Sequence, residues 1–192
     1  MSQLSFFSAE TDEPSLDDLS GLLATTGQSI TFAGGVRVSV VVDAQWRADA
    51  LAAEMAETGL SVHVGISDEG SPLVRTESTS RLRELHERWT RGAIKTMPAD
   101  WVPSPRSLRL WTIAAGERDG DRYLLALDPH AADSQASLAT AVMRAGIAPT
   151  LVGTRGHHPA LRIAGRRRLT RLLESIGDPP PVTGAADHWP TL

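Results

Sequence analysis

Arginine is the residue type whose arrangement in this sequence most directly suggests a binding chemistry. Six arginines lie within residues 155–171, with Glu174 as the one acidic residue near them; they are Arg155, Arg162, Arg166, Arg167, Arg168 and Arg171. A guanidinium group pairs with phosphate oxygens through parallel hydrogen bonds, so this patch permits nucleic acid binding. Arg166, Arg167 and Arg168 begin an expected helix, where residues about 100° apart fan around the axis and cannot share one phosphate. A solvated helix start is the alternative interpretation of these three residues.

The other side chains that carry chemistry form no pattern of their own. The chain has no cysteine, which excludes disulfides and thiolate metal sites, and its six histidines show no metal-ligand spacing. His157 and His158 stand in a turn flanked by Gly and Pro. We therefore predict no catalytic residue, no metal and no cofactor from these residue types.

Charge is unevenly distributed along the 192 residues. The net charge is −4, but residues 1–27 contain five acidic residues and no basic one, and the remainder contains 19 basic and 18 acidic residues. The body is therefore nearly neutral, with the arginine-rich stretch as a local basic patch. No apolar run approaches the roughly 20 residues that span a bilayer, and the acidic N-terminus is unlike a signal peptide. We expect a cytoplasmic, nucleoid-associated protein without a membrane partner.

The sequence contains an internal duplication. LSGLLATTG at residues 19–27 matches LRLWTIAAG at residues 108–116, and LVRTESTSRLREL from Leu73 matches ALRIAGRRRLTRLLESIG from Ala160. Gly65 and Gly153 mark a further matching pair. A nearly constant offset across several segments predicts two halves of the same fold.

Each half is expected to follow the order α-β-β-α-β-β-α. Residues 36–40 alternate with a period of two, which is typical of a half-buried strand. Residues 45–58 have small and apolar residues at helical spacing and end at Gly59. Further strands are expected at residues 61–64 and 72–76, and a helix at residues 79–91 that buries Leu82, Leu85 and Trp89.

Proline-containing segments set the expected boundaries. Residues 1–14 are expected to be a disordered tail, 15–92 the first half, 93–104 a Pro-containing linker, 105–177 the second half and 178–192 a disordered Pro-rich tail. Two fused halves predict a monomer that is a pseudo-dimer.

With this order of elements, residues 15–177 resemble the LAGLIDADG homing endonucleases. The resemblance rests on the duplication, on the two small-residue helices that end at Gly27 and Gly116, and on the closing strand and helix. It implies an α+β fold of two pseudo-symmetric α-β-β-α-β-β-α halves, whose eight strands form a concave β saddle covered by helices on the other side. It also implies that the two motif helices pack through small residues, here Ser20, Gly21, Ala24 and Thr25 against Thr112, Ala114 and Ala115.

The catalytic acids of that family are missing from this chain. An active member has an acidic residue just before the terminal Gly of each motif helix, and the two acids hold divalent metal ions. The matching residues here are Thr26 and Ala115. We therefore interpret the chain as a binding protein and not an enzyme, as in the WhiA-type bacterial regulators that it resembles in this respect. The alternative is a nuclease with displaced acids, for which Glu117, Asp119 and Asp121 are the candidates.

The resemblance places duplex DNA on the strand face that points away from the helices. Period-two alternation predicts that Ser29, Thr31, Arg37, Ser39, His63, Arg75, Glu77, Arg122, Thr150 and Arg162 lie on it, with Leu124 and Ala126 beside Arg122. Ile30, Phe32, Val38, Val40, Val62 and Val64 are expected to face the helices. We predict DNA contacts for Arg37, Ser39, His63, Arg75, Arg122, Arg162, Arg166 and Arg167. A protein interface or a solvated sheet is the alternative for this face.

The N-terminal peptide Gln3-Leu4-Ser5-Phe6-Phe7 is similar to the short peptides by which bacterial replication and repair proteins dock on the DNA polymerase sliding clamp. Leu4, Phe6 and Phe7 suit an apolar pocket, and Gln3 suits directional hydrogen bonds at its rim. The similarity implies a non-catalytic DNA-associated protein recruited to the clamp, an accessory of replication or repair. The alternatives are a peptide that folds back onto the domain, and a WhiA-like transcriptional regulator or protein-interaction module that uses the saddle without the clamp.

Overall fold

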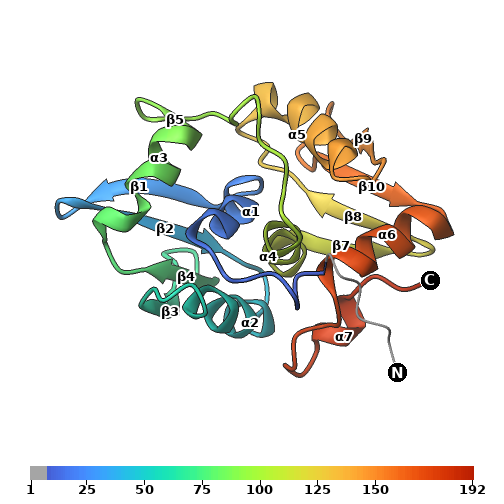
Figure 1. The fold of residues 1–192 in the computed structure, drawn as a ribbon, viewed down its shortest axis with the longest axis horizontal. Coiled ribbons are helices and arrows are strands. Elements are labelled where there is room, and N and C mark those ends of the chain that lie inside the picture. The colour runs from blue at the N-terminus through green and yellow to red at the C-terminus, as the bar shows by residue number, and fades with distance from the viewer. Residues whose placement is uncertain (1–7) are drawn as a thin grey trace.

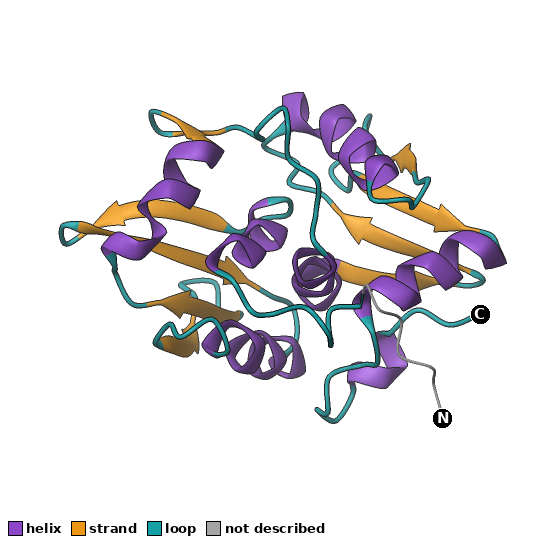
Figure 2. Ribbon diagram, viewed as in Figure 1, coloured by secondary structure: helices purple, strands orange, loops and turns teal. Residues whose placement is uncertain are grey.

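Two four-stranded antiparallel sheets lie side by side, and helices cover one face of both (Figure 1, Figure 2). The computed structural model describes residues 8–192. The predicted α+β fold of two similar halves is confirmed. Within the described residues, no helix has the length and apolar character needed to cross a membrane.

The first half has the predicted order of elements. It consists of η1 (Leu16–Leu19), α1 (Ser20–Leu23), β1 (Gln28–Phe32), β2 (Gly35–Val41), α2 (Gln45–Ala56), β3 (Val62–Ile66), β4 (Pro72–Thr76), η2 (Ser80–Leu82) and α3 (Arg83–Trp89). A small hairpin of β5 (Thr90–Arg91) and β6 (Ile94–Lys95) follows it. Leu82, Leu85 and Trp89 are buried as predicted.

The second half repeats this order. It consists of α4 (Pro105–Ala115), β7 (Gly116–Asp119), β8 (Arg122–Ala126), α5 (Ala132–Arg144), β9 (Thr150–Val152), β10 (Ala160–Ala164) and α6 (Arg166–Ile176), and a short helix α7 (Ala185–His188) follows. The strand order is β1-β2-β4-β3 in one sheet and β7-β8-β10-β9 in the other. Matching strand orders show that the duplication seen in the sequence is also a duplication of topology.

The two motif helices α1 and α4 cross in direct contact at the centre of the molecule (Figure 1). A Cβ atom added to Gly21 would lie 1.9 Å from the backbone oxygen of Ser107, so the helices approach this closely because Gly21 has no side chain. The Ser20 and Ser107 hydroxyls also lie 3.1 Å apart. Small residues therefore do bring the helices together, but Gly21 meets Ser107 near the start of α4 and not the predicted Ala114 region.

Tryptophans surround this crossing. Trp101 packs edge-on against Trp89 at 5.0 Å between ring centroids, and Trp111 lies 6.4 Å from Trp101. The Trp101 indole donates a hydrogen bond to the Ser20 hydroxyl at 3.0 Å. Residues 93–104 therefore do more than link the halves, because Trp101 is part of the shared core.

The expectation of a disordered tail at residues 178–192 is wrong. Residues 185–188 form α7, and Ala185 and Trp189 are buried. The Trp189 indole donates to the Gly177 backbone oxygen at 3.0 Å, and Arg109 stacks on the ring at 5.5 Å. The three prolines suggested disorder, but the buried Trp189 anchors the segment to the helix layer.

The expected tail at residues 1–14 is also partly ordered. Ser8 and Ala9 are buried, and the Ala9 backbone N–H donates to the Ser175 backbone oxygen of α6 at 2.7 Å. Glu10 accepts a hydrogen bond from the Asp178 backbone N–H at 2.9 Å. The clamp-peptide residues 3–7 lie outside the described residues.

Candidate nucleic-acid interface

Strand register places polar side chains in rows across the helix-free face of the first sheet. Residues directly opposite each other in an antiparallel pair share a face. The register connects Gln28 to Ser39, Ser39 to Arg75 and Arg75 to His63, so one row crosses all four strands. Arg37 lies two residues from Ser39 on β2 and belongs to the same face.

The second sheet has the equivalent rows. Glu117 lies opposite Leu124, Leu124 opposite Arg162, and Arg162 opposite Thr150. The next row contains Arg122, which lies opposite both Asp119 and Ala164. The residues predicted for this face in the second half therefore lie on it, with Leu124 and Ala126 beside them.

When the strand rows of the two sheets are aligned, each arginine of one sheet corresponds to an arginine of the other. Arg37 and Arg122 occupy equivalent positions on β2 and β8, and Arg75 and Arg162 occupy equivalent positions on β4 and β10. At the other positions of these rows the residue types differ between the halves, as with Ser39 and Leu124. The candidate interface therefore contains two symmetry-related pairs of guanidinium groups, one pair member in each half.

The surroundings of these arginines differ. Arg37 is half-buried, and its guanidinium stacks on the Phe32 ring at 4.6 Å. Arg75 is exposed, and Arg122 lies 3.6 Å from Asp121 in a solvent-exposed pair. An exposed ion pair of this type contributes only about 0–1 kcal/mol, so a phosphate can displace it.

Acidic residues interrupt the positive charge of this face. His63 Nε2 lies 3.1 Å from Glu77 Oε1, and both side chains are more than half exposed. Glu117 and Asp119 lie on the second sheet in the rows of Arg162 and Arg122. The face thus mixes basic, acidic and apolar residues, which fits spaced contacts to phosphates better than a uniform electrostatic field.

The predicted orientation of β1 is wrong. Ser29 lies opposite Val38, is 8% exposed, and its hydroxyl is 2.9 Å from His86 Nδ1. Thr31 lies on the same, helix-facing side, whereas Ile30 and Phe32 lie on the candidate interface and are 41% and 51% exposed. Edge strand β1 mixes polar and apolar residues. The Ser29 hydroxyl forms its hydrogen bond with a residue of α3 instead of with water.

A largely buried cation lies at the C-terminal end of α1. Lys95 Nζ lies 2.5 Å from the Thr25 backbone oxygen and 3.0 Å from that of Gly27, and it pairs with Asp128 at 2.5 Å. Burial lowers the pKa of Lys95, and the neighbouring Asp128 carboxylate opposes that shift. The ammonium group satisfies two backbone carbonyls of the turn that follows α1, on either side of Thr26.

A second buried cation closes the end of α4. Arg47 is 4% exposed and donates to the backbone oxygens of Ile113 at 2.7 Å and Gly116 at 2.8 Å. Its Nε donates to Asp43 at 2.8 Å. Both motif helices therefore end at a basic side chain, beside Thr26 in one half and Ala115 in the other. Neither cation could be expected from the sequence, because Lys95 lies in the linker and Arg47 lies on an otherwise apolar helix face.

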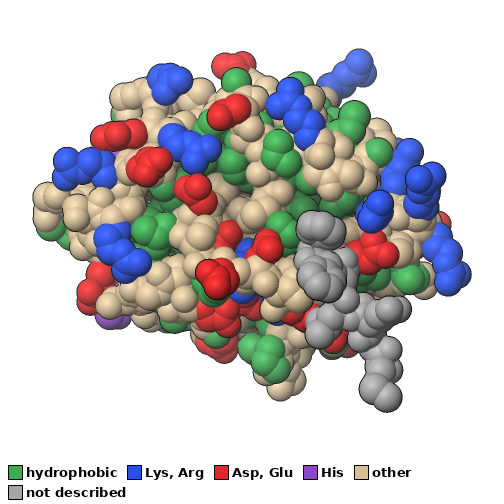
Figure 3. All heavy atoms as spheres, in the orientation of Figure 1, with side chains coloured by type: hydrophobic (Ala, Val, Ile, Leu, Met, Phe, Trp, Pro, Cys, Tyr) green, Lys and Arg blue, Asp and Glu red, His purple; other side chains and the backbone are tan. Residues whose placement is uncertain are grey.

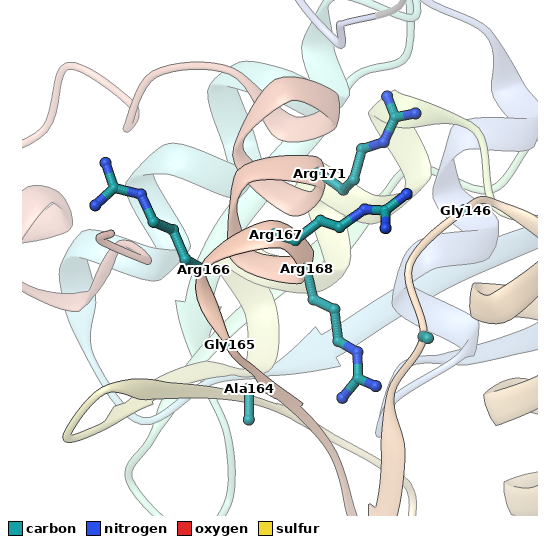
Figure 4. Close-up of a pocket in the computed structure, with 8 residues that line it drawn as sticks. Gly146, Ala164, Gly165, Arg166, Arg167, Arg168 and Arg171 are labelled. Carbon is teal, nitrogen blue, oxygen red and sulfur yellow. The ribbon is translucent and has the colours of Figure 1, made fainter.

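Arg166 and Arg167 lie apart from the strand rows. They begin α6 and line a cavity together with Arg168, Arg171 and the loop at Gly146 (Figure 4). Lys and Arg side chains are visible at the right-hand margin of the space-filling view, over α6 (Figure 3). The predicted DNA residues thus divide into the sheet face and this separate cavity.

Solved structures share this fold. The homing endonuclease I-WcaI bound to its DNA recognition sequence matches with a TM-score of 0.62 and 10% identity over 86% of this chain and 82% of that chain. The N-terminal LAGLIDADG domain of DUF199/WhiA matches with a TM-score of 0.57 and 13% identity over 85% and 82%. Full-length DUF199/WhiA from Thermatoga maritima matches with a TM-score of 0.60 and 13% identity over 90% of this chain and 56% of that chain. Neither models of protein families nor curated protein sequences gave a match. These likenesses establish the LAGLIDADG fold.

Proposed function

We propose that this chain, which has the LAGLIDADG fold, is a non-catalytic protein that binds duplex DNA through the helix-free face of its two sheets. The observation that carries this proposal is the two pairs of equivalent arginines, Arg37 with Arg122 and Arg75 with Arg162, with one member of each pair in each half. Guanidinium groups at two matching places fit phosphates on either side of a duplex. The match to a homing endonuclease bound to its DNA recognition sequence supports DNA as the partner.

The ends of the motif helices support a role without catalysis. Thr26 and Ala115 offer no carboxylate there, and the ammonium of Lys95 and the guanidinium of Arg47 occupy the helix ends. At each helix end the backbone carbonyls are already bound by a cationic side chain, which is itself paired with Asp128 or Asp43. We expect no metal-dependent cleavage of duplex DNA, whereas nicking that disappears in Glu117, Asp119 or Asp121 variants would identify displaced catalytic acids.

Duplex binding is tested by fluorescence anisotropy with a labelled duplex at several salt concentrations. Single Arg37→Ala, Arg75→Ala and Arg162→Ala variants should each weaken binding several-fold and reduce the salt dependence by about one released ion. Arg83→Ala is the matched control, since Arg83 is exposed on α3 away from this face. Wild-type affinity in all three variants would mean that the face serves another partner.

We further propose that residues 3–7 recruit the protein to the bacterial sliding clamp, as an accessory of DNA replication or repair. Ser8 and Ala9 attach the chain to α6 in the helix layer, so the peptide is joined to the body on the side away from the sheet face. In this proposal, clamp docking and DNA binding use different surfaces of the protein. The proposal includes a nucleoid-associated location in the cell.

The clamp proposal is tested with purified sliding clamp and the Phe6→Ala/Phe7→Ala double variant. We expect clamp binding to be lost and the melting temperature to be unchanged, because anchor rings contribute mainly in the complex. Phe32→Ala is the matched control, since this third phenylalanine is 51% exposed on the sheet face. Clamp affinity that survives in the double variant contradicts the proposal, and so does a melting temperature that collapses.

A protein-interaction module, or a WhiA-like regulator working without the clamp, is the second candidate. It is favoured by apolar side chains on the sheet face, where Ile30 and Phe32 are exposed and Leu124 is partly exposed. Neither form of this candidate binds the clamp. A regulator that uses the saddle for DNA should still lose duplex affinity in the arginine variants, whereas a protein-interaction module should show no change in duplex affinity.

A further inference from the structure

Four arginines line a cavity of about 580 Å³ at the start of α6. Arg167, Arg168 and Arg171 extend from α6 toward the segment around Gly146, whereas Arg166 extends to the other side of the helix (Figure 4). All four side chains are exposed. The other lining residues are Gly146, Ala148, Ala164 and Gly165, so no acidic residue lines the cavity.

The placement of these charges is unfavourable for the helix itself. Arg167 and Arg171 are four residues apart and Arg168 and Arg171 three apart, and like charges at these spacings repel each other along a helix face. The first turn of α6 contains no acidic residue, although acidic and not basic residues stabilise the start of a helix. Glu174 offsets only Arg171, in an exposed pair at 3.3 Å. A residue choice that works against helix stability is typical of a binding site.

The small residues opposite the arginines leave room for a ligand. Gly146 and Ala148 belong to the loop between α5 and β9, and Ala164 and Gly165 join β10 to α6. With at most a methyl group at each of these four positions, the cavity keeps the three guanidinium groups that extend into it accessible. Its shape and charge both suit a compact, multiply charged anion.

We propose that this cavity is a binding site for clustered phosphates, separate from the arginine pairs of the sheet face. Arg167, Arg168 and Arg171 supply guanidinium groups that pair with phosphate oxygens in planar, bidentate geometry. Ala164 lies opposite Arg122 in the strand register, so the cavity adjoins the edge of the candidate DNA face. The clustered phosphates belong either to a nucleic acid strand that leaves the sheet face or to a free polyphosphate such as that of a nucleotide.

The experiment measures the binding of inorganic triphosphate by titration calorimetry and the binding of a long duplex by anisotropy, both with the full chain. The cavity variant is Arg167→Ala/Arg168→Ala/Arg171→Ala, and Arg83→Ala/Arg91→Ala is the control, since both of these arginines are exposed outside the cavity. We expect the cavity variant to lose at least about ten-fold in affinity for one of the two probes, and the control to lose none.

The two probes distinguish the source of the phosphates. A loss confined to the duplex identifies a nucleic acid strand, and a loss for triphosphate identifies a free polyphosphate. Unchanged affinity for both probes in the cavity variant, or an equal loss in the control, overturns the proposal. Arg37→Ala/Arg75→Ala reports on the sheet face alone, because that variant should weaken duplex binding and leave triphosphate binding intact. Failure of the proposed DNA function is therefore distinguishable from failure of this site.

Discussion

Lys95 and Arg47, the cations at the ends of the two motif helices, both bind backbone carbonyls, but their carboxylate partners differ in exposure. We therefore predict very different interaction free energies between each cation and its carboxylate in double-mutant cycles. Lys95 and Asp128 are both buried, with side chains 11% and 5% exposed. The Arg47 side chain is 5% exposed, but its partner Asp43 is 77% exposed. Removal of the cation leaves a buried carboxylate in the first pair and a solvated carboxylate in the second.

The magnitudes follow from this difference. Lys95→Met strands the Asp128 carboxylate and should lower the free energy of unfolding by about 3–5 kcal/mol. Adding Asp128→Asn removes that charge, and an Asn oxygen still accepts the hydrogen bond that the His130 N–H donates to Asp128 at 2.9 Å. The double variant should therefore recover about 2 kcal/mol or more of the loss.

The matched cycle uses Arg47→Met and Asp43→Asn. Arg47→Met should cost about 2–4 kcal/mol, because the Ile113 and Gly116 carbonyls lose their charged donor. Its coupling to Asp43 should be only about 0–1 kcal/mol, because water solvates the exposed carboxylate. Urea unfolding followed by circular dichroism gives all the values by linear extrapolation. Equal coupling energies in the two cycles would refute the reasoning from burial.

Three further predictions concern the core. Gly21→Ala should destabilise the protein by about 1–3 kcal/mol or more, because the added methyl group forces α1 and α4 apart. Gly65→Ala is the control and should be nearly neutral in thermal melts, because the space around Gly65 is open. Burial raises the pKa of Asp18, so its contribution to stability is full at low pH and is lost as pH rises through the folded-state pKa. The stability of the wild type relative to Asp18→Asn should therefore fall from about pH 4 upward in urea titrations, and a pH-independent difference would contradict the sign. Trp189→Ala should cost about 3–5 kcal/mol, and an unchanged melting temperature would show that the C-terminal segment is dispensable.

The halves and their element order could be predicted because the sequence repeats at the level that determines topology. In β2 the strict alternation that buries Val38 and Val40 identifies both the strand and its faces. The same reasoning failed in β1, where Ser29 is buried through a hydrogen bond to His86, a residue 57 positions away. Only the tertiary structure supplies such a partner. The polarity of a residue on a short edge strand therefore does not reliably predict which face of the sheet its side chain occupies.

The prediction of disorder for residues 178–192 failed for a related reason. Local composition, with Pro179, Pro180 and Pro181 in a row, indicates a chain that cannot form regular structure. One buried side chain reverses this, since Trp189 packs under Arg109 and donates to Gly177. The roles of Lys95 and Arg47 could not be predicted for the same reason. A single basic residue forms no sequence pattern, and its role is seen only when the carbonyls that it binds are known.

Comparison of the two halves shows which parts of the duplicated face have been kept alike. The row positions Gln28 and Glu117, Ser39 and Leu124, and His63 and Thr150 have diverged in charge, polarity or size. The two positions with arginine in one half have arginine in the other as well. Side chains between the arginines vary freely if they read different bases or none, while phosphates present the same chemistry to both halves. The pattern of identity and difference therefore fits the proposed contact with a duplex that has two unlike half-sites, whereas a protein partner without internal symmetry gives no reason for the arginines alone to match.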